Sequence, residues 1–118
     1  MTNEVAILEL ADRLVALLNA HDLEGALELV TDDFVFESTS PAPDGARYEG
    51  KAAVRVIWAE MLESTPKLRF TTEEQFAVPP DRVVVRWHYD WGDGHVRGMD
   101  LLRVRGGKFS ENLSYVKG

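Results

Sequence analysis

The sequence predicts one α+β domain in which helices cover one face of an antiparallel sheet. Segments with helical periodicity fill most of residues 2–64, and runs of alternating apolar and polar residues joined by short turns fill the rest. Helices followed by hairpin-linked strands are typical of this class. At 118 residues the chain forms a single domain, residues 1–118, which is large enough for a core with a pocket inside it.

Charge and composition exclude several functions. The net charge is −7 and the basic residues are scattered along the chain, which disfavours nucleic acid and anionic membranes as partners. Cysteine is absent, which excludes disulfides, thiolate nucleophiles and zinc–thiolate sites. The N-terminal stretch MTNEVAILELADRL carries acids where a signal peptide has basic residues, so we expect a soluble cytoplasmic protein.

Three segments have the apolar spacing of helices. The first lies within residues 2–22, and its apolar stripe consists of Ile7, Leu10, Ala11, Leu14, Leu17 and Leu18. Thr2 or Asn3 is the expected cap of this helix, and Asp22 is the expected cap of a short second helix that follows it. A third helix over residues 51–64 places along one side Val54, Trp58, Met61 and Leu62.

The strands are predicted from alternation and from the turn residues between them. A brief strand over residues 32–38 follows the second helix, and a loop rich in Pro and Gly follows that strand over residues 39–50. Later strands are expected at residues 67–78, 82–91, 96–104 and 108–116. We therefore expect a sheet built mostly from consecutive hairpins.

One of these hairpins fixes the predicted faces of the sheet. Asp93-Gly94 is the signal for a two-residue type I′ turn, which would set Trp87 opposite Asp100. Directly opposed residues share a face. The inner, apolar face then carries Val83, Val85, Trp87, Tyr89, Trp91, Val96, Asp100, Leu102 and Val104. The outer face carries most of the arginines, with Asp90 opposite Arg97 as a charge pair.

Asp100 is unusual because it is a carboxylate on this apolar face. A lone ionised carboxylate among apolar neighbours costs several kcal/mol unless it is paired, hydrogen-bonded or protonated. Burial against Trp87 should raise the pKa of Asp100, because burial disfavours the charged form. A carboxyl group whose pKa approaches the working pH can both take and give a proton. The sequence therefore indicates Asp100 as a candidate general acid or base.

The order of the elements resembles a known family. The strand DDFVFES after NAHDLEGALELV, the helix start YEGKAAVRVIW and the ending VRGMDLLRVRGGKFSENLSYV are similar to the SnoaL-like branch of the nuclear transport factor 2-like (NTF2-like) superfamily. That superfamily includes ketosteroid isomerases, polyketide cyclases and limonene epoxide hydrolases. The resemblance implies a conical, cystatin-like barrel whose curved antiparallel sheet wraps the N-terminal helices around a deep apolar pocket. It also implies a homodimer through the outer sheet face, near Met99 and Leu101.

Only part of the catalytic residue set of these enzymes has a counterpart in this chain. Ketosteroid isomerases use a tyrosine, a general-base aspartate and a protonated aspartate. In this chain Leu14 stands where the tyrosine belongs, Ser38 stands where the base belongs, and only Asp100 is retained. The epoxide hydrolases need an Asp-Arg-Asp set, but Arg97 points to the opposite face in the predicted register. Polyketide cyclases, which work with a single aspartate on this strand, are the better match.

The predicted site combines these residues with an aromatic wall. Its catalytic set is Asp100, Asn112 and Ser38, and its pocket set is Leu14, Leu18, Phe36, Trp58, Met61, Trp87, Tyr89, Trp91, Leu102 and Ser114. Glu37 replaces the missing base only if its strand is bulged. The resemblance turns Asn112 and Ser114 inward, whereas a strict turn at Gly106-Gly107 would instead turn inward the more apolar set of Phe109, Leu113 and Tyr115.

Two functional hypotheses follow from this site. The first is an enzyme of the polyketide cyclase or isomerase type, which acts by acid–base chemistry on a hydrophobic cyclic or aromatic substrate. The second is a non-catalytic ligand-binding or dimerisation domain on the same scaffold. We expect a small hydrophobic molecule and a second copy of the chain as partners. No cofactor and no metal site are expected.

Overall fold

The computed structural model describes residues 4–118 and confirms the α+β class. The predicted caps Thr2 and Asn3 lie outside the described residues. In chain order the elements are α1 Glu4–Asn19, α2 Leu23–Glu28, β1 Val30–Glu37, β2 Arg47–Glu49, α3 Lys51–Ser64, β3 Arg69–Val78, β4 Arg82–Asp90, β5 His95–Arg105 and β6 Lys108–Val116. The short strand β2 lies inside the segment that the sequence predicted to be a loop.

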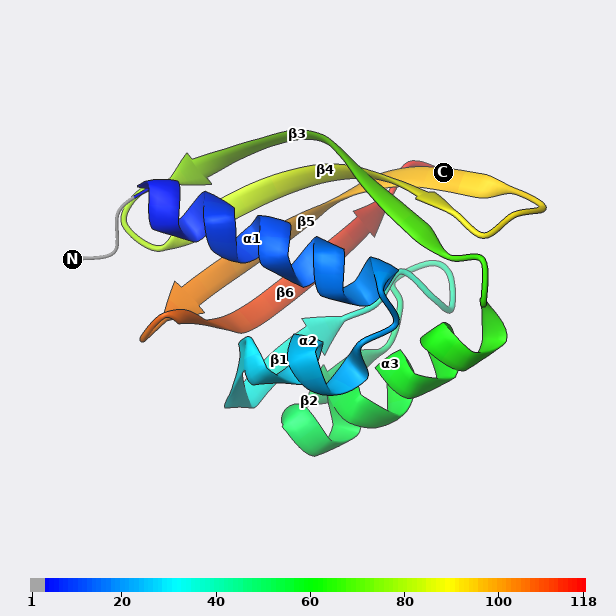
Figure 1. Ribbon diagram of the computed structural model, residues 1–118, viewed down its shortest axis with the longest axis horizontal. Coiled ribbons are helices and arrows are strands. Elements are labelled where there is room, and N and C mark those ends of the chain that lie inside the picture. The colour runs from blue at the N-terminus through cyan, green and yellow to red at the C-terminus, as the bar shows by residue number, and fades with distance from the viewer. Residues whose placement is uncertain (1–3) are drawn as a thin grey trace.

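The six strands form one curved, unclosed sheet in the order β2-β1-β6-β5-β4-β3. Figure 1 shows α1 lying across one face of this sheet, while α3 lies beside the edge that β1 and β2 form. The later strands pair antiparallel, as predicted, but β1 pairs with β6 in parallel. The fully antiparallel prediction is therefore wrong for this pair. The first and last strands meet directly, which brings the end of β1 beside the second half of β6.

The core lies between α1 and the concave face of the sheet. The predicted stripe of α1 is buried at Ile7, Leu10, Ala11, Leu14 and Leu18, and each fully buried large aliphatic side chain contributes about 1.5–3 kcal/mol. The turn after α1 passes through His21, which is exposed and has a positive φ of 56°. Asp22 then caps α2, as predicted, by accepting a hydrogen bond of 2.8 Å from the backbone N–H of Gly25.

The predicted register of the β4–β5 hairpin is wrong by two residues. Asp90 pairs with His95, so that Val85 lies opposite Asp100 and Gly98 lies opposite Trp87. Residues 91–94 connect the two strands, and Asp90 Oδ1 accepts a hydrogen bond of 2.7 Å from the N–H of Gly92, which has a φ of 105°. A shift of two residues preserves the side-chain alternation, so the predicted inner and outer faces of both strands are retained.

The β5–β6 hairpin resolves the face of the last strand. Gly106 and Gly107, with φ of 60° and 80°, form the predicted two-residue turn, and Phe109 is fully buried opposite Val104. The register then shifts between Arg103 and Val104, where one extra residue in β6 forms a bulge. Both alternatives from the sequence are thus partly right. Phe109 points inward before the bulge, and the two polar residues Asn112 and Ser114 point inward after it.

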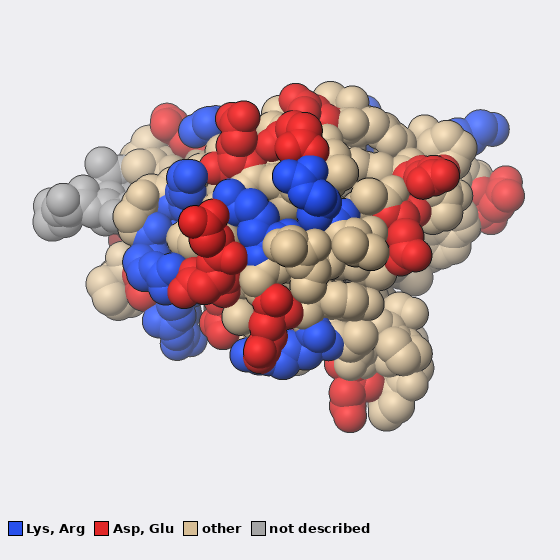
Figure 2. Space-filling model, turned by 90° about the horizontal axis from the view of Figure 1, so that it is seen from below, with Lys and Arg blue, Asp and Glu red and all other residues tan. Residues whose placement is uncertain are grey.

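The outer face of the sheet is charged. Glu73 on β3 forms ion pairs with Arg97 at 3.1 Å and with Arg86 at 3.5 Å. The predicted pair of Asp90 with Arg97 is wrong, because the register sets His88 opposite Arg97. Figure 2 shows acidic and basic side chains intermixed on another side of the molecule. Within residues 4–118, no helix is long and apolar enough to cross a membrane. The homodimer through the outer face stays a prediction.

Candidate functional site: a cavity beside Asp100

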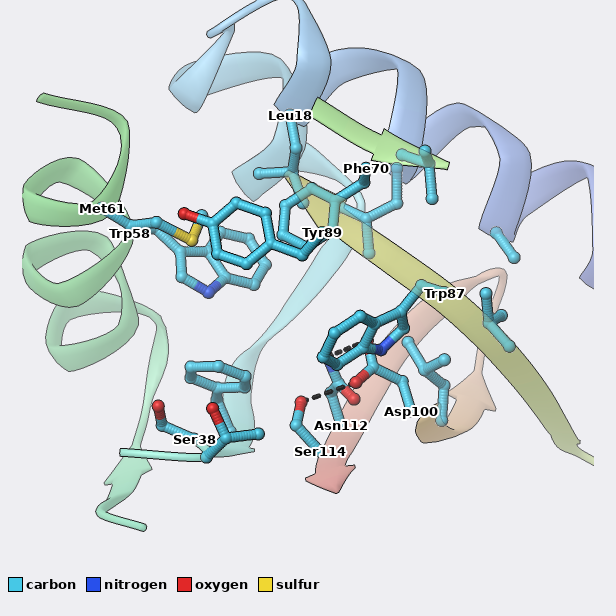
Figure 3. Close-up of a pocket in the computed structure, with 17 residues that line it drawn as sticks. Leu18, Ser38, Trp58, Met61, Phe70, Trp87, Tyr89, Asp100, Asn112 and Ser114 are labelled. Carbon is cyan, nitrogen blue, oxygen red and sulfur yellow. Dashed lines mark hydrogen bonds between the residues drawn. The ribbon is translucent and has the colours of Figure 1, made fainter. Parts of the chain in front are cut away.

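A cavity of about 140 Å³ lies between α1, α3 and the concave face of the sheet. Apolar and aromatic side chains form most of its wall, and Asp100, Asn112 and Ser114 form a polar group on one side (Figure 3). An engineered cavity of about 150 Å³ in another protein holds benzene. The inner space therefore fits a single six-membered ring, and a fused multi-ring molecule would have to extend beyond it.

Asp100 is held by two neighbours on β6. The hydroxyl of Ser114 donates a hydrogen bond of 2.7 Å to Asp100 Oδ1, and the side-chain amide of Asn112 donates a longer one of 3.4 Å to Oδ2. Ser114 is the cross-strand partner of Asp100, so the β5–β6 register positions this contact. The indole nitrogen of Trp87 lies beside the same carboxyl group, without a hydrogen bond of ordinary geometry (Figure 3).

Burial raises the pKa of Asp100. Desolvation by the surrounding side chains is the largest cause, while the polar groups of Ser114, Trp87 and Asn112 oppose it by favouring the charged form. The residue keeps some accessible surface, but the side chains packed around its carboxyl group are dense enough for desolvation to dominate. The site thus holds a carboxyl group that protonates more readily than an exposed aspartate.

Replacing Ser114 tests this balance. We expect Ser114→Ala to raise the pKa of Asp100 further, because the variant loses a hydrogen bond that stabilises the carboxylate. Carboxyl-carbon NMR titration of Asp100 measures the change. Ser38→Ala is the matched control, since Ser38 accepts a hydrogen bond from the N–H of Ser40 and none is described between it and Asp100. A lower pKa in Ser114→Ala, or an equal rise in the control, contradicts the expectation.

Aromatic side chains form the wall next to Asp100. Tyr89 stacks on Phe70 with ring centroids 4.6 Å apart, and Trp87 meets the same ring edge-on at 6.1 Å. The backbone of Phe70 is fixed by Asn19 at the end of α1, which exchanges hydrogen bonds of 2.7 and 2.9 Å with it. Trp58 from α3 also belongs to the cavity wall, and its ring meets that of Phe36 edge-on with centroids 6.0 Å apart. These contacts give the cavity flat surfaces suited to a planar ring.

The structure brings nearly all the predicted site residues together. Those that line the cavity are Leu14, Leu18, Phe36, Ser38, Trp58, Met61, Trp87, Tyr89, Asp100, Leu102, Asn112 and Ser114. Five further residues line the cavity that the sequence did not predict for the pocket: Ala11, Val15, Thr39, Phe70 and Val85. Phe70 could have been found from the β3–β4 pairing, because it is the cross-strand partner of Tyr89. The catalytic roles of the predicted residues stay predictions.

Trp91 is the predicted pocket residue that does not line the cavity. It lies in the four-residue connection after β4, where its ring tilts against Tyr89 at 5.6 Å and packs over Gly94, at which an added Cβ would lie 2.8 Å from the ring. The position is therefore corrected from pocket wall to hairpin tip. The error arises because the N–H of Trp91 donates a hydrogen bond of 3.1 Å to the oxygen of Gly94, so the hairpin tip lies one residue earlier than predicted, and β4 ends at Asp90.

Other candidates for acid–base or metal chemistry lie away from the cavity. Glu37 forms an ion pair of 2.8 Å with Arg47 and does not line the cavity. His95 packs edge-on against His88 with ring centroids 4.8 Å apart. Arg97 is on the outer face, as predicted, in its ion pair with Glu73. Among residues 4–118, no three His, Asp or Glu side chains are grouped to hold a metal ion.

The comparisons with known proteins agree with this fold. A family model for the SnoaL-like domain matches residues 11–112. An NTF2-like protein of unknown function from Mesorhizobium loti is 38% identical, with a TM-score of 0.85 over 100% of this chain and 96% of its own. No curated protein sequence matches the chain.

Two more distant structures carry functional descriptions. A proposed ketosteroid isomerase from Kribbella flavida is 21% identical, with a TM-score of 0.83 over 100% of this chain and 82% of its own. A proposed polyketide cyclase from Sinorhizobium meliloti is 16% identical, with a TM-score of 0.78 over 91% and 94% of the two chains. Similarity at these identities shows the fold alone. With the match over residues 11–112 and the 38% identical relative, the chain belongs to the SnoaL-like domain family of NTF2-like proteins.

Proposed function

We propose that this protein is an acid–base enzyme that acts on a small hydrophobic cyclic molecule, with Asp100 as the group that moves the proton. The observation that carries the proposal is a carboxyl group with a raised pKa in the wall of an apolar cavity, held in place by Ser114 and Asn112. Such a group accepts a proton as the carboxylate and returns it as the acid within one bound complex.

The chemistry suited to a single carboxyl group is proton transfer beside a carbonyl. The carboxylate removes a proton from the carbon next to the carbonyl, and the resulting enolate is then protonated elsewhere or attacks a second carbonyl to close a ring. Isomerases and aldol-type cyclases share this first step. The descriptions of the Kribbella flavida and Sinorhizobium meliloti proteins point in the same direction. Ser38 and Leu14 lack the groups that the classical steroid isomerases use, so a one-carboxylate mechanism is proposed here.

A single-ring enone tests the proposal. We expect the protein to convert 3-cyclohexen-1-one to the conjugated 2-cyclohexen-1-one, which ultraviolet absorbance detects. Asp100→Asn should slow this conversion about 10²–10⁴-fold, the range usual for loss of a general acid or base. The control is Asp44→Asn, which removes the same charge from the exposed loop between β1 and β2. Equal rates in the wild type and Asp100→Asn would overturn the catalytic role.

A non-catalytic ligand-binding domain is the second candidate. The observation that favours it is that each carboxyl oxygen of Asp100 already accepts a hydrogen bond from β6, so the group also has a structural role. A binding domain would show ligand-dependent NMR shifts at Trp87 and Asp100 without conversion of any enone. The isomerisation assay and the binding titration, made on the same sample, therefore separate the two functions.

A further inference from the structure

The cavity beside Asp100 adjoins a second hollow. A more open groove lies on the side of the cavity toward α3 and the segment after β1, residues 38–40. The cavity and the groove share six wall residues: Phe36, Ser38, Thr39, Trp58, Met61 and Tyr89. Asp100, Asn112 and Ser114 belong to the cavity alone, so they lie on its inner side. A ring in the cavity can therefore carry a substituent that extends into the groove.

The side chains along this path that ionise as carboxyl groups have no basic counterpart among the described residues of its wall. Asp100 lines the cavity, and Glu60 and Glu63 from α3 line the groove. Both glutamates are exposed, and neither forms an ion pair with another described residue. Within residues 4–118, no Lys, Arg or His lines either hollow. The remaining polar wall groups are uncharged: the side chains of Ser38, Thr39, Ser40, Ser64, Tyr89, Asn112 and Ser114, and the indole N–H groups of Trp58 and Trp87.

This arrangement discriminates between ligands by charge. A carboxylate or phosphate that leaves water for this path loses hydration and finds no cation to replace it. It also meets the like charges of Glu60 and Glu63, and like-charge contacts oppose binding. An amine gains from the same glutamates, although their exposure weakens the gain. A hydroxyl group finds hydrogen-bonding partners among the serines without a charge penalty.

We propose that the site takes a single-ring molecule whose substituent is uncharged or cationic, such as an alcohol or an amine, and that it rejects the corresponding carboxylates and phosphates. The assignment rests on the proposed function only in placing the ring in the cavity beside Asp100. The selection by charge comes from the walls of the cavity and the groove, whose described residues include acidic ones and no lysine or arginine.

Three ligands that share a phenyl ring and a two-carbon chain test the proposal: 2-phenylethanol, 2-phenylethylamine and phenylacetate. Titrations at pH 7 follow the indole N–H signal of Trp87, assigned with Trp87→Phe. We expect phenylacetate to bind at least about 10-fold more weakly than 2-phenylethanol, the ratio that corresponds to about 1.4 kcal/mol. We expect 2-phenylethylamine to bind at least as tightly as the alcohol at low salt, and to lose that advantage at high salt.

Two double variants, each of which removes two negative charges, test whether the preference for the amine arises at Glu60 and Glu63. Glu60→Gln with Glu63→Gln should weaken the amine a few-fold and leave the alcohol unchanged. The control, Glu9→Gln with Glu28→Gln, changes the net charge equally at exposed positions that line neither hollow. Equal effects in the two double variants would overturn the local role of Glu60 and Glu63.

The ligand series also separates the two proposals. If phenylacetate binds as tightly as 2-phenylethanol and both shift the Trp87 signal, the charge selection is overturned while the cavity remains a ring-binding site. If none of the three ligands shifts the Trp87 signal, the cavity does not bind a ring, and both proposals are overturned. Weak phenylacetate binding beside clear binding of the alcohol supports the charge selection whatever the outcome of the enone assay.

Discussion

Asp100→Asn should make the protein more stable at neutral and alkaline pH, although it removes the proposed catalytic group. Folding raises the pKa of Asp100 above its ordinary value of 3.8, so the folded chain binds this proton more tightly than the unfolded chain. The contribution of Asp100 to stability is therefore greatest below that ordinary value and falls as the pH rises through the folded-state pKa. Each unit by which the pKa is raised corresponds to about 1.4 kcal/mol.

The side-chain amide in the Asp100→Asn variant is uncharged at every pH, so folding does not have to bury a charge at this position. Its oxygen can still accept the hydrogen bond from Ser114, and its N–H₂ group needs an acceptor. Asn112 can supply that acceptor by turning its own amide, because Asn112 Oδ1 is buried without a partner. The free energy of unfolding of the variant should therefore rise relative to that of the wild type as the pH increases from the ordinary pKa of Asp100 to its folded-state pKa. Above the folded-state pKa the difference should stay constant.

Urea unfolding between pH 3.5 and 9 measures this difference, since the midpoint reports stability when the slope is unchanged. Asp44→Asn, on the exposed loop, controls for the change in net charge and should show no comparable gain. If Asp100→Asn is less stable than the wild type at pH 8, Asp100 is a carboxylate that its neighbours already stabilise. The acid–base proposal would then lose its basis.

Gly98→Ala should strongly destabilise the protein and disturb the site. A Cβ at this position would lie 2.2 Å from the backbone oxygen of Tyr115 and 2.6 Å from the ring of Trp87. Real side chains do not approach backbone atoms so closely, so β6 would have to move away from β5. Overpacking of this kind costs about 1–3 kcal/mol and occasionally more. Because the clash adjoins Ser114, the hydrogen bond to Asp100 should also weaken.

Unfolding experiments and the NMR titration of Asp100 check this expectation together. We expect a loss of at least about 2 kcal/mol, together with a higher pKa of Asp100 in any folded variant. His95→Ala is the control, because it places alanine at an exposed residue of the same strand. A free energy of unfolding for Gly98→Ala within about 0.5 kcal/mol of the wild type would show that β5 and β6 tolerate a side chain there.

The fold and the inner face of β4 and β5 could be predicted because they depend on repeated local signals. The apolar stripe of α1 recurs over several turns, and the alternation from Val83 to Tyr89 survives even a wrong register, since an error of two residues leaves every side chain on its face. The resemblance to the SnoaL-like family extended this prediction to the curved sheet. Asp100 was identifiable because a carboxylate interrupts an apolar face.

The last strand shows where local signals fail. Alternation along β6 favours Phe109, Leu113 and Tyr115 on one face, and the Gly106-Gly107 turn agrees for Phe109. The bulge after Phe109 reverses the alternation, and no residue type in KFSENLSYV requires a bulge there. The pairing with β1 on the other side of β6 also shifts in register between Phe109 and Glu111, so both neighbours of β6 are irregular at this place.

The sequence by itself thus determined the class of fold, the stripe of α1 and the place of Asp100 on an apolar face. Only the tertiary structure decided what surrounds that carboxyl group: Ser114 and Asn112 turned inward, Phe70 added to the wall, and Trp91 excluded from it. Periodicity is a property of one segment, whereas strand register, bulges and turn lengths depend on the hydrogen bonds that several strands make together.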